Sequence, residues 1–167
     1  ITFGNSGIGT VTHMTAEKFR MRAGILVTPV SYKGGSIPVI ALLSGEIAMV
    51  MATVPASIPY VRQGKLVALG LAAPRRFPTL PDIPTLSETV KDVEVAVFSG
   101  VLAPAGTPQN VIERLNAEFA KASDTPQARE IFAANAAEAI KMSPAALKQE
   151  LERDVKTWAE VVKATGV

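Results

Sequence analysis

Residues 4–10 read Gly-Asn-Ser-Gly-Ile-Gly-Thr, a short stretch with three glycines and two hydroxyl residues. It follows a short apolar start and precedes a segment with helical patterning, so it predicts a strand–loop–helix turn. Free N–H groups at a helix start carry about half a positive charge, and glycines let a ligand approach the backbone closely. Ser6 and Thr10 add hydroxyl donors. The stretch therefore favours an anion, which could be a carboxylate, a phosphate or a sulfate.

Three better-known glycine motifs do not fit this loop. Gly4 and Gly9 have the outer spacing of a P-loop, but Thr10-Val11 stands where a lysine and a hydroxyl residue belong. The dinucleotide-binding motif lacks its third glycine, and Ser6 is not in a G-x-S-x-G elbow. A tight glycine turn without any ligand explains the local pattern about as well as an anion site does.

Short apolar runs alternate with helical segments through the first two-thirds of the chain, which is typical of an α/β fold with a mainly parallel sheet. We expect strands at 25–30, 47–51, 66–72 and 93–97. We expect helices from Thr10 to Ala23, from Ser36 to Gly45, and after Thr53 toward Gly64, with Pro59 disturbing the third. Prolines at 74, 78, 81 and 84 predict an extended segment without a helix.

The last third changes character, because consecutive helices replace the alternation. Helices are predicted after Thr107-Pro108, from Asp124 to near Asn135, and from Ser143-Pro144 onward. Asn135 tolerates left-handed geometry and is a natural end for the second of these helices. The change places a boundary between residues 97 and 108.

Composition excludes several classes of protein. The 167 residues are 48% apolar and 19% charged, which suits a globular domain. There is no cysteine and a single histidine, so cysteine or multi-histidine metal sites and thiol catalysis are excluded. Seventeen basic residues against fifteen acidic ones do not indicate nucleic-acid binding. The apolar stretch 37–61 is broken by prolines and Gly45-Glu46, so no membrane span is predicted. Residues 1–4 do not have the pattern of a signal peptide, and we expect them to come from inside a larger chain or from a processed product.

No catalytic set can be assembled from the sequence. His13 follows the glycine loop, and a structural histidine that bonds within the loop is a better interpretation than a catalytic one. Residues 32–36 form a second glycine-rich loop, which should open at the same sheet edge as the first, where ligands collect in open α/β sheets. Lys33 within it is either an anion contact or a solvated turn residue.

The order of these motifs resembles one family. Asn5 to Thr10 with His13, then Val30 to Gly34, the proline stretch 80–85 with Glu88, and Ala103 to Pro108 are similar to the Bug-type solute receptors of tripartite tricarboxylate transporters. The resemblance runs in order along essentially the whole chain.

The resemblance implies a periplasmic-binding-protein-like fold of type II, in which two α/β lobes close on a small carboxylate. Residues 1–97 would form one complete lobe, lobe two, and residues 98–167 the returning, mostly helical part of lobe one. It implies a periplasmic receptor rather than an enzyme, without a cofactor, whose partners are a small di- or tricarboxylate and the membrane permease. The ligand-binding residues it implies are Ser6, Gly7, Ile8, Gly9, Thr10, Tyr32, Gly34 and Ala52.

Two departures from the family pattern carry expectations of their own. The family's first segment of lobe one is absent here, so we expect exposed apolar faces and self-association, as a homodimer or a swapped assembly. Ala52 stands where many members have an aspartate that can pair with a ligand amino group, so a carboxylate without an amine is expected. The alternatives are a ligand-sensing regulatory domain of the same fold and, further away, an anion-binding α/β enzyme.

Overall fold

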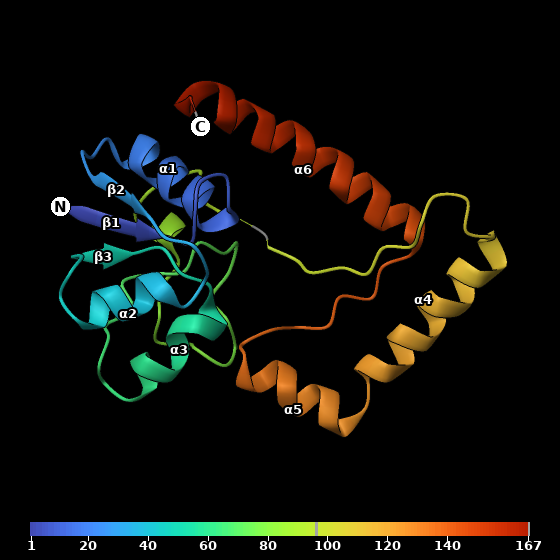
Figure 1. Ribbon diagram of the computed structural model, residues 1–167. Coiled ribbons are helices and arrows are strands. Elements are labelled where there is room, and N and C mark those ends of the chain that lie inside the picture. Colours follow the sequence, from blue (N-terminus) through green and yellow to red (C-terminus); the bar gives the residue numbers. More distant parts are fainter. Residues whose placement is uncertain (96, 167) are drawn as a thin grey trace. The chain divides into compact units, whose positions relative to one another are not determined.

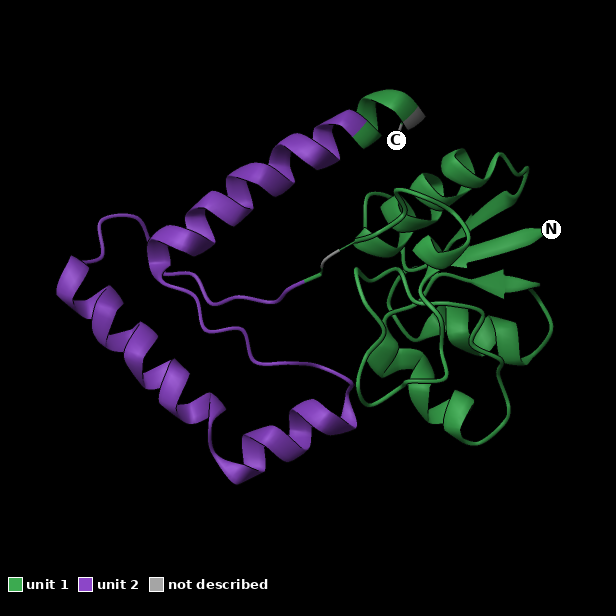
Figure 2. Cartoon of the chain, turned by 180° about the vertical axis from the view of Figure 1, so that it is seen from behind, with its two compact units in different colours: residues 1–97, 161–167 green, residues 98–160 purple. Residues whose placement is uncertain are grey.

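The computed structural model describes residues 1–95 and 97–166. The chain divides into two compact units, residues 1–97 with 161–167 and residues 98–160 (Figure 2). The first unit contains the sheet and the first three helices, and the second contains helices that follow one another along the chain (Figure 1).

A three-stranded parallel sheet forms the centre of the first unit, in the order β2-β1-β3. Strand β1 (Thr2–Asn5) lies between β2 (Thr28–Ser31) and β3 (Met49–Val50). Helix α1 (Val11–Ala23) connects β1 to β2, and helix α2 (Ile37–Leu43) connects β2 to β3. Helix α3 (Val54–Arg62) follows β3 and contains Pro59. The carboxyl ends of the three strands therefore meet at one sheet edge, as the alternating pattern predicts.

The two faces of β1 are covered by different helices. The ring of Phe3 meets Phe19 of α1 edge to face, with the ring centroids 6.5 Å apart. A Cβ placed on Gly4, the next residue, would point to the opposite face, where Ile47 and Pro38 of α2 lie closest to it. Because side chains alternate along a strand, Asn5 returns to the α1 face. Phe3, Gly4 and Asn5 are all buried.

The predicted ends of the first helix are confirmed in detail. Thr10 is the N-cap of α1 and its hydroxyl accepts from the His13 N–H, whereas Gly24 is left-handed with φ 64° and ends the helix. The helices predicted after Ser36 and Thr53 are also present, although Ser36 makes no side-chain cap.

Two predicted strands are not strands in the structure, and the other two are shorter than predicted; β3 covers Met49–Val50 rather than residues 47–51. Residues 66–72 form a single parallel bridge, Leu71 to Thr85, because Leu71 bonds the chain that returns from the proline segment. In the predicted strand 93–97, Ala96 lies outside the described residues, and Val95 donates to the carbonyl of Ala72 at 3.0 Å. Strand β2 begins at Thr28 rather than at residue 25.

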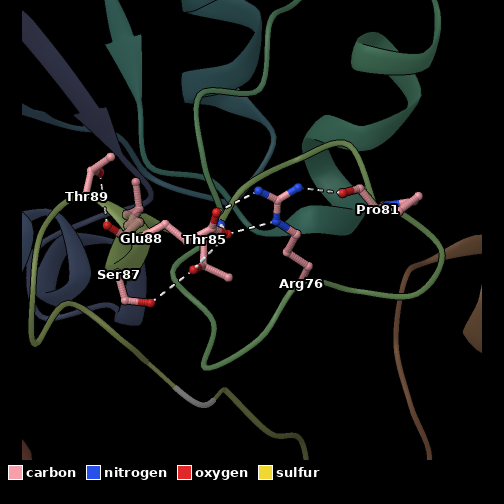
Figure 3. A network of polar contacts seen from close by, with 7 residues as sticks. Arg76, Pro81, Thr85, Ser87, Glu88 and Thr89 are labelled. Atoms are coloured by element: carbon pink, nitrogen blue, oxygen red, sulfur yellow. Dashed lines mark hydrogen bonds and ion pairs between the residues drawn. The ribbon is translucent and has the colours of Figure 1, made fainter.

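The proline segment is held by a polar network around one arginine (Figure 3). Arg76 donates from Nε and Nη2 to the two carboxylate oxygens of Glu88, at 2.8 and 2.6 Å, and from Nη1 to the carbonyl of Pro81 at 3.0 Å. Glu88 also accepts from the backbone N–H of Thr85, which completes a capping box on the 3₁₀ helix Leu86–Glu88. The two arginine bonds and the Thr85 bond lower the Glu88 pKa to about 2.

The second unit buries little of itself. Helices α4 (Gln109–Ser123), α5 (Pro126–Ala134) and α6 (Pro144–Thr165) follow one another. Along α4 the apolar side chains of Val111, Leu115 and Phe119 recur every four residues and are 40–50% exposed. Within residues 98–160, Ala136 is the one residue classed as buried.

Helix α5 ends near Asn135 as predicted, but the left-handed residue is the one after it. Asn135 has φ −97°, and Ala136 takes the left-handed conformation at φ 49°. The N–H of Ala137 bonds the carbonyl of Phe132 at 2.8 Å, and that of Ala136 bonds Ala133 at 3.2 Å. This is the Schellman pattern, which requires the left-handed residue after the C-cap rather than at it.

The close packing around Gly4 predicts that a side chain there destabilises the fold and that a smaller neighbour partly restores stability. A Cβ added at Gly4 lies 2.4 Å from Ile47 Cδ1, so Gly4→Ala should lower the free energy of unfolding by about 1–3 kcal/mol. Adding Ile47→Val removes Cδ1 and should recover part of the loss. Gly35→Ala, which meets nothing within 4 Å, is the control and should change little. Urea unfolding measures all four proteins; equal stability of the Gly4 and Gly35 variants would contradict the packing described.

The lowered pKa of Glu88 predicts an acid-dependent contribution to stability. Its ordinary value is 4.5, so the ionised carboxylate stabilises the fold above that pH and loses this effect as the pH falls toward 2. Glu88→Gln should lower the melting temperature at pH 7 by a few degrees, and the difference from the unsubstituted protein should shrink as the pH falls from 4.5 toward 2. Glu94→Gln is the control, since Glu94 has no described side-chain contact. A Glu88→Gln difference independent of pH would rule out the Arg76 pairing as its cause.

Candidate functional site

The carboxyl edge of the sheet brings three loops together. Residues 6–10 follow β1, residues 32–36 follow β2, and residues 51–53 follow β3. The N–H of Tyr32 donates to Asn5 O at 3.0 Å, that of Gly34 to Ser6 O at 3.2 Å, and that of Met51 to Gly4 O at 2.9 Å. Of the predicted site residues, this edge includes Ser6 to Thr10, the backbone of Tyr32 and Gly34, and Ala52 directly after Met51.

The glycine loop is held in shape by its own polar groups. Gly7 donates from its N–H to Asn5 Oδ1 at 2.9 Å, and Gly9 donates to His13 Nδ1 at 3.1 Å. The Thr10 hydroxyl donates to Gly7 O at 2.6 Å. Gly7 has φ 136°, and a Cβ there would lie 3.0 Å from the Tyr32 carbonyl, so a side chain is excluded both by strain and by space.

His13 is therefore an acceptor within the loop. Its ring is buried, with 7% of its surface exposed, and Nδ1 is occupied by the Gly9 N–H. This agrees with the structural interpretation of the sequence. Among the described residues no group of three histidine, cysteine, aspartate or glutamate side chains could hold a metal ion.

Donors without acceptors remain at this edge. The first-turn N–H groups of Val11 and Thr12 have no acceptor among the described hydrogen bonds, as expected at a helix start. The hydroxyl of Ser6 and the amide Nδ2 of Asn5 are both buried without a hydrogen-bond partner among the described residues. Buried polar groups are nearly always paired, so two neighbouring donors without a partner are an exception that calls for an explanation.

The side chain of Tyr32 lies on a different face of the sheet. Its ring carbon Cε2 is 3.5 Å from a Cβ placed on Gly4, which is on the α2 face, and its hydroxyl donates to Glu46 at 2.7 Å. The carboxylate raises the Tyr32 pKa. The hydroxyl proton is committed to Glu46, so the contribution of Tyr32 to the edge comes through its backbone.

Asn5 is the residue that the sequence prediction missed. The sequence places it in the loop motif and not among the ligand contacts, yet it is fully buried and its amide orients the loop. The available signal was an asparagine at the end of an apolar strand, directly before the glycines. An amide in that position can accept from the turn and still donate elsewhere.

The unpartnered hydroxyl of Ser6 and the partnered hydroxyl of Thr12 should contribute differently to stability. Ser6→Ala removes a buried hydroxyl without a partner, so the melting temperature should stay the same or rise. Thr12→Val removes the oxygen that accepts from the Ser6 N–H at 3.0 Å, and this should cost about 1–3 kcal/mol. Thermal unfolding of both variants tests the assignment; a large loss in Ser6→Ala would show that the hydroxyl has a structural partner.

The family model described as the tripartite tricarboxylate transporter family receptor matches residues 1–167. A UPF0065 protein of Cupriavidus necator is 34% identical over 168 residues, which is 100% of this chain and 51% of that protein. The chain spans about half the length of the first curated relatives it matches.

Two solved structures share the fold closely. An R. palustris protein solved with adipate superposes with a TM-score of 0.88 at 28% identity, over 99% of this chain and 56% of that one. MatC from Rhodopseudomonas palustris, solved with bound malate, superposes with a TM-score of 0.84 at 26% identity, over 97% of this chain and 56% of that one. These likenesses confirm the predicted fold class, a partial periplasmic-binding-protein fold. The chain belongs to the receptors of the tripartite tricarboxylate transporter family.

Proposed function

We propose that this chain is the solute-binding part of a periplasmic receptor for a small di- or tricarboxylate that serves a tripartite tricarboxylate transporter. The observation that carries the proposal is the set of unpaired donors at the carboxyl edge: the first-turn N–H groups of α1 and the Ser6 hydroxyl. Donors around a helix start bind a carboxylate well, because the helix geometry already directs their N–H groups toward an anion. Family membership and the adipate- and malate-bound relatives support the same class of ligand.

The charges of the three loops also favour an anion. Residues 6–10, 32–36 and 51–53 contain one charged side chain, Lys33, and no acid. Glu46, the acid that accepts from Tyr32, precedes β3 and so belongs to the opposite end of that strand. The described edge can therefore attract a carboxylate, and Ala52 offers nothing to a ligand ammonium group.

Binding of carboxylates is tested first by thermal shift with C3 to C8 acids, followed by calorimetry. An acid at 100 times its Kd should stabilise the chain by about 2.7 kcal/mol. Ser6→Ala should weaken the binding of that acid about tenfold or more, because a hydrogen bond to a charged group is lost. No shift with any acid would contradict the proposal that this chain binds by itself.

The choice between acids with and without an amine has a matched test. Malate and aspartate differ by a hydroxyl in place of an ammonium group, and glutarate and glutamate form a second pair. We expect malate and glutarate to bind more tightly than their amino counterparts, since Ala52 leaves the ammonium group without a partner. Ala52→Asp should narrow or reverse the preference. Tighter binding of aspartate by the unsubstituted chain would contradict this proposal.

The last step of the proposed function is recognition of the liganded receptor by the membrane permease. In such a receptor, closure of two lobes on the ligand is the signal to a permease. None of the described helices is long and apolar enough to cross a bilayer. Binding of the liganded chain to permease-containing vesicles, compared with the ligand-free chain, tests this step.

We also propose that the chain self-associates through the exposed apolar stripe of α4. Three side chains, Val111, Leu115 and Phe119, are 40–50% exposed at a spacing of four residues, which is unusual for a stable free surface. Size exclusion with light scattering should show a dimer or larger species, and Leu115→Glu should shift it toward monomer. Lys121→Glu, a change of charge on the same helix outside the stripe, is the control. A compact monomer at micromolar concentration would contradict the proposal.

A further inference from the structure

A buried amide beneath the glycine loop extends the proposed site. Asn5 has no exposed surface, and its side chain points to the α1 face of the sheet, at the carboxyl end of β1. Its Oδ1 accepts the Gly7 N–H at 2.9 Å. This bond fixes the orientation of the amide, so the atom left over is the donor Nδ2 rather than the carbonyl oxygen.

The donor Nδ2 has no acceptor among the described residues, and the neighbouring Ser6 hydroxyl is in the same situation. An unsatisfied buried donor lowers stability, so a site that keeps two of them on consecutive residues is suited to an acceptor that arrives from outside. Both are next to the first turn of α1, because the Ser6 N–H donates to Thr12 Oγ1 at 3.0 Å.

Access to these donors depends on few bonds. Between the loop 6–10 and the loop 32–36, the described residues make one hydrogen bond, from Gly34 N–H to Ser6 O at 3.2 Å. Gly7 and Gly34 have φ of 136° and 130°, in a region that glycine alone occupies readily. A ligand oxygen can therefore enter by parting the two loops while the strand ladder behind them stays intact.

We infer that Asn5 is a ligand-binding residue, whose Nδ2 donates to a carboxylate oxygen of the bound acid beside the Ser6 hydroxyl. The inference rests on the proposed function and adds a residue to its site. The Oδ1 atom of Asn5 positions the glycine loop through its bond with Gly7, and the Nδ2 atom binds the acid. A single side chain therefore couples the shape of the loop to the binding of the acid.

The first test observes the amide in the unsubstituted chain. The sequence contains four asparagines, so selective ¹⁵N-asparagine labelling gives a simple spectrum of side-chain amides. Two of the others are internal controls, since Asn116 and Asn135 already donate to the carbonyls of Met142 and Ile131. Titration with malate and with adipate should shift the Asn5 amide signals and slow their hydrogen exchange, and leave the two controls in place.

The second test reverses the polarity of the amide. Asn5→Asp keeps an oxygen for the Gly7 N–H and replaces the donor with a negatively charged acceptor, so the affinity for the acid should fall about tenfold or more.

The possible results distinguish a failure of the proposed function from a failure of the role of Asn5. If calorimetry detects no binding of either acid by the unsubstituted chain, both the proposed function and the role of Asn5 are contradicted. If an acid binds and the Asn5 signals do not move, or folded Asn5→Asp binds it equally well, the role of Asn5 alone is overturned. The labelling experiment needs no variant, so a folding defect in Asn5→Asp does not prevent a decision.

Discussion

The hydrogen bond from the Gly7 N–H to Asn5 Oδ1 is the interaction on which the site depends. It joins the last residue of the central strand to a glycine whose φ of 136° no ordinary side chain could adopt without strain. The bond turns the chain from the sheet into α1, brings the helix start to the sheet edge, and orients an amide whose second group remains unpaired. The loop is therefore ordered before a ligand arrives, which lowers the cost of ordering it on binding.

The glycine loop is well ordered, but it leaves two buried donors without acceptors among the described residues. Buried donors without acceptors lower stability, and a domain selected for stability alone would replace Ser6 with alanine. In the site that we propose, the bound acid supplies the missing acceptors, so the affinity for the acid includes the relief of their cost. The same reasoning explains why His13, whose Nδ1 is satisfied inside the loop, stabilises the site rather than binding.

Local signals predicted much of this structure, and tertiary contacts decided the rest. Thr10 and Gly24 bound α1 as expected, because caps and left-handed glycines act through neighbouring residues. Residues 66–72 have the composition of a strand, but Leu71 pairs with the chain around Thr85, a partner that no local pattern reveals. The loop residues 6–10 were predicted as a site, whereas the burial of Asn5 and the turn of the Tyr32 ring toward Glu46 depend on packing across the sheet.

The central claim is that a carboxylate binds at the glycine loop after β1. A crystal structure of this chain grown with adipate tests it most directly, because it shows where the acid lies. The account predicts one carboxylate within hydrogen-bond distance of the Ser6 hydroxyl and of N–H groups in residues 8–12. Adipate bound at another surface, with this loop unchanged and empty, would contradict it.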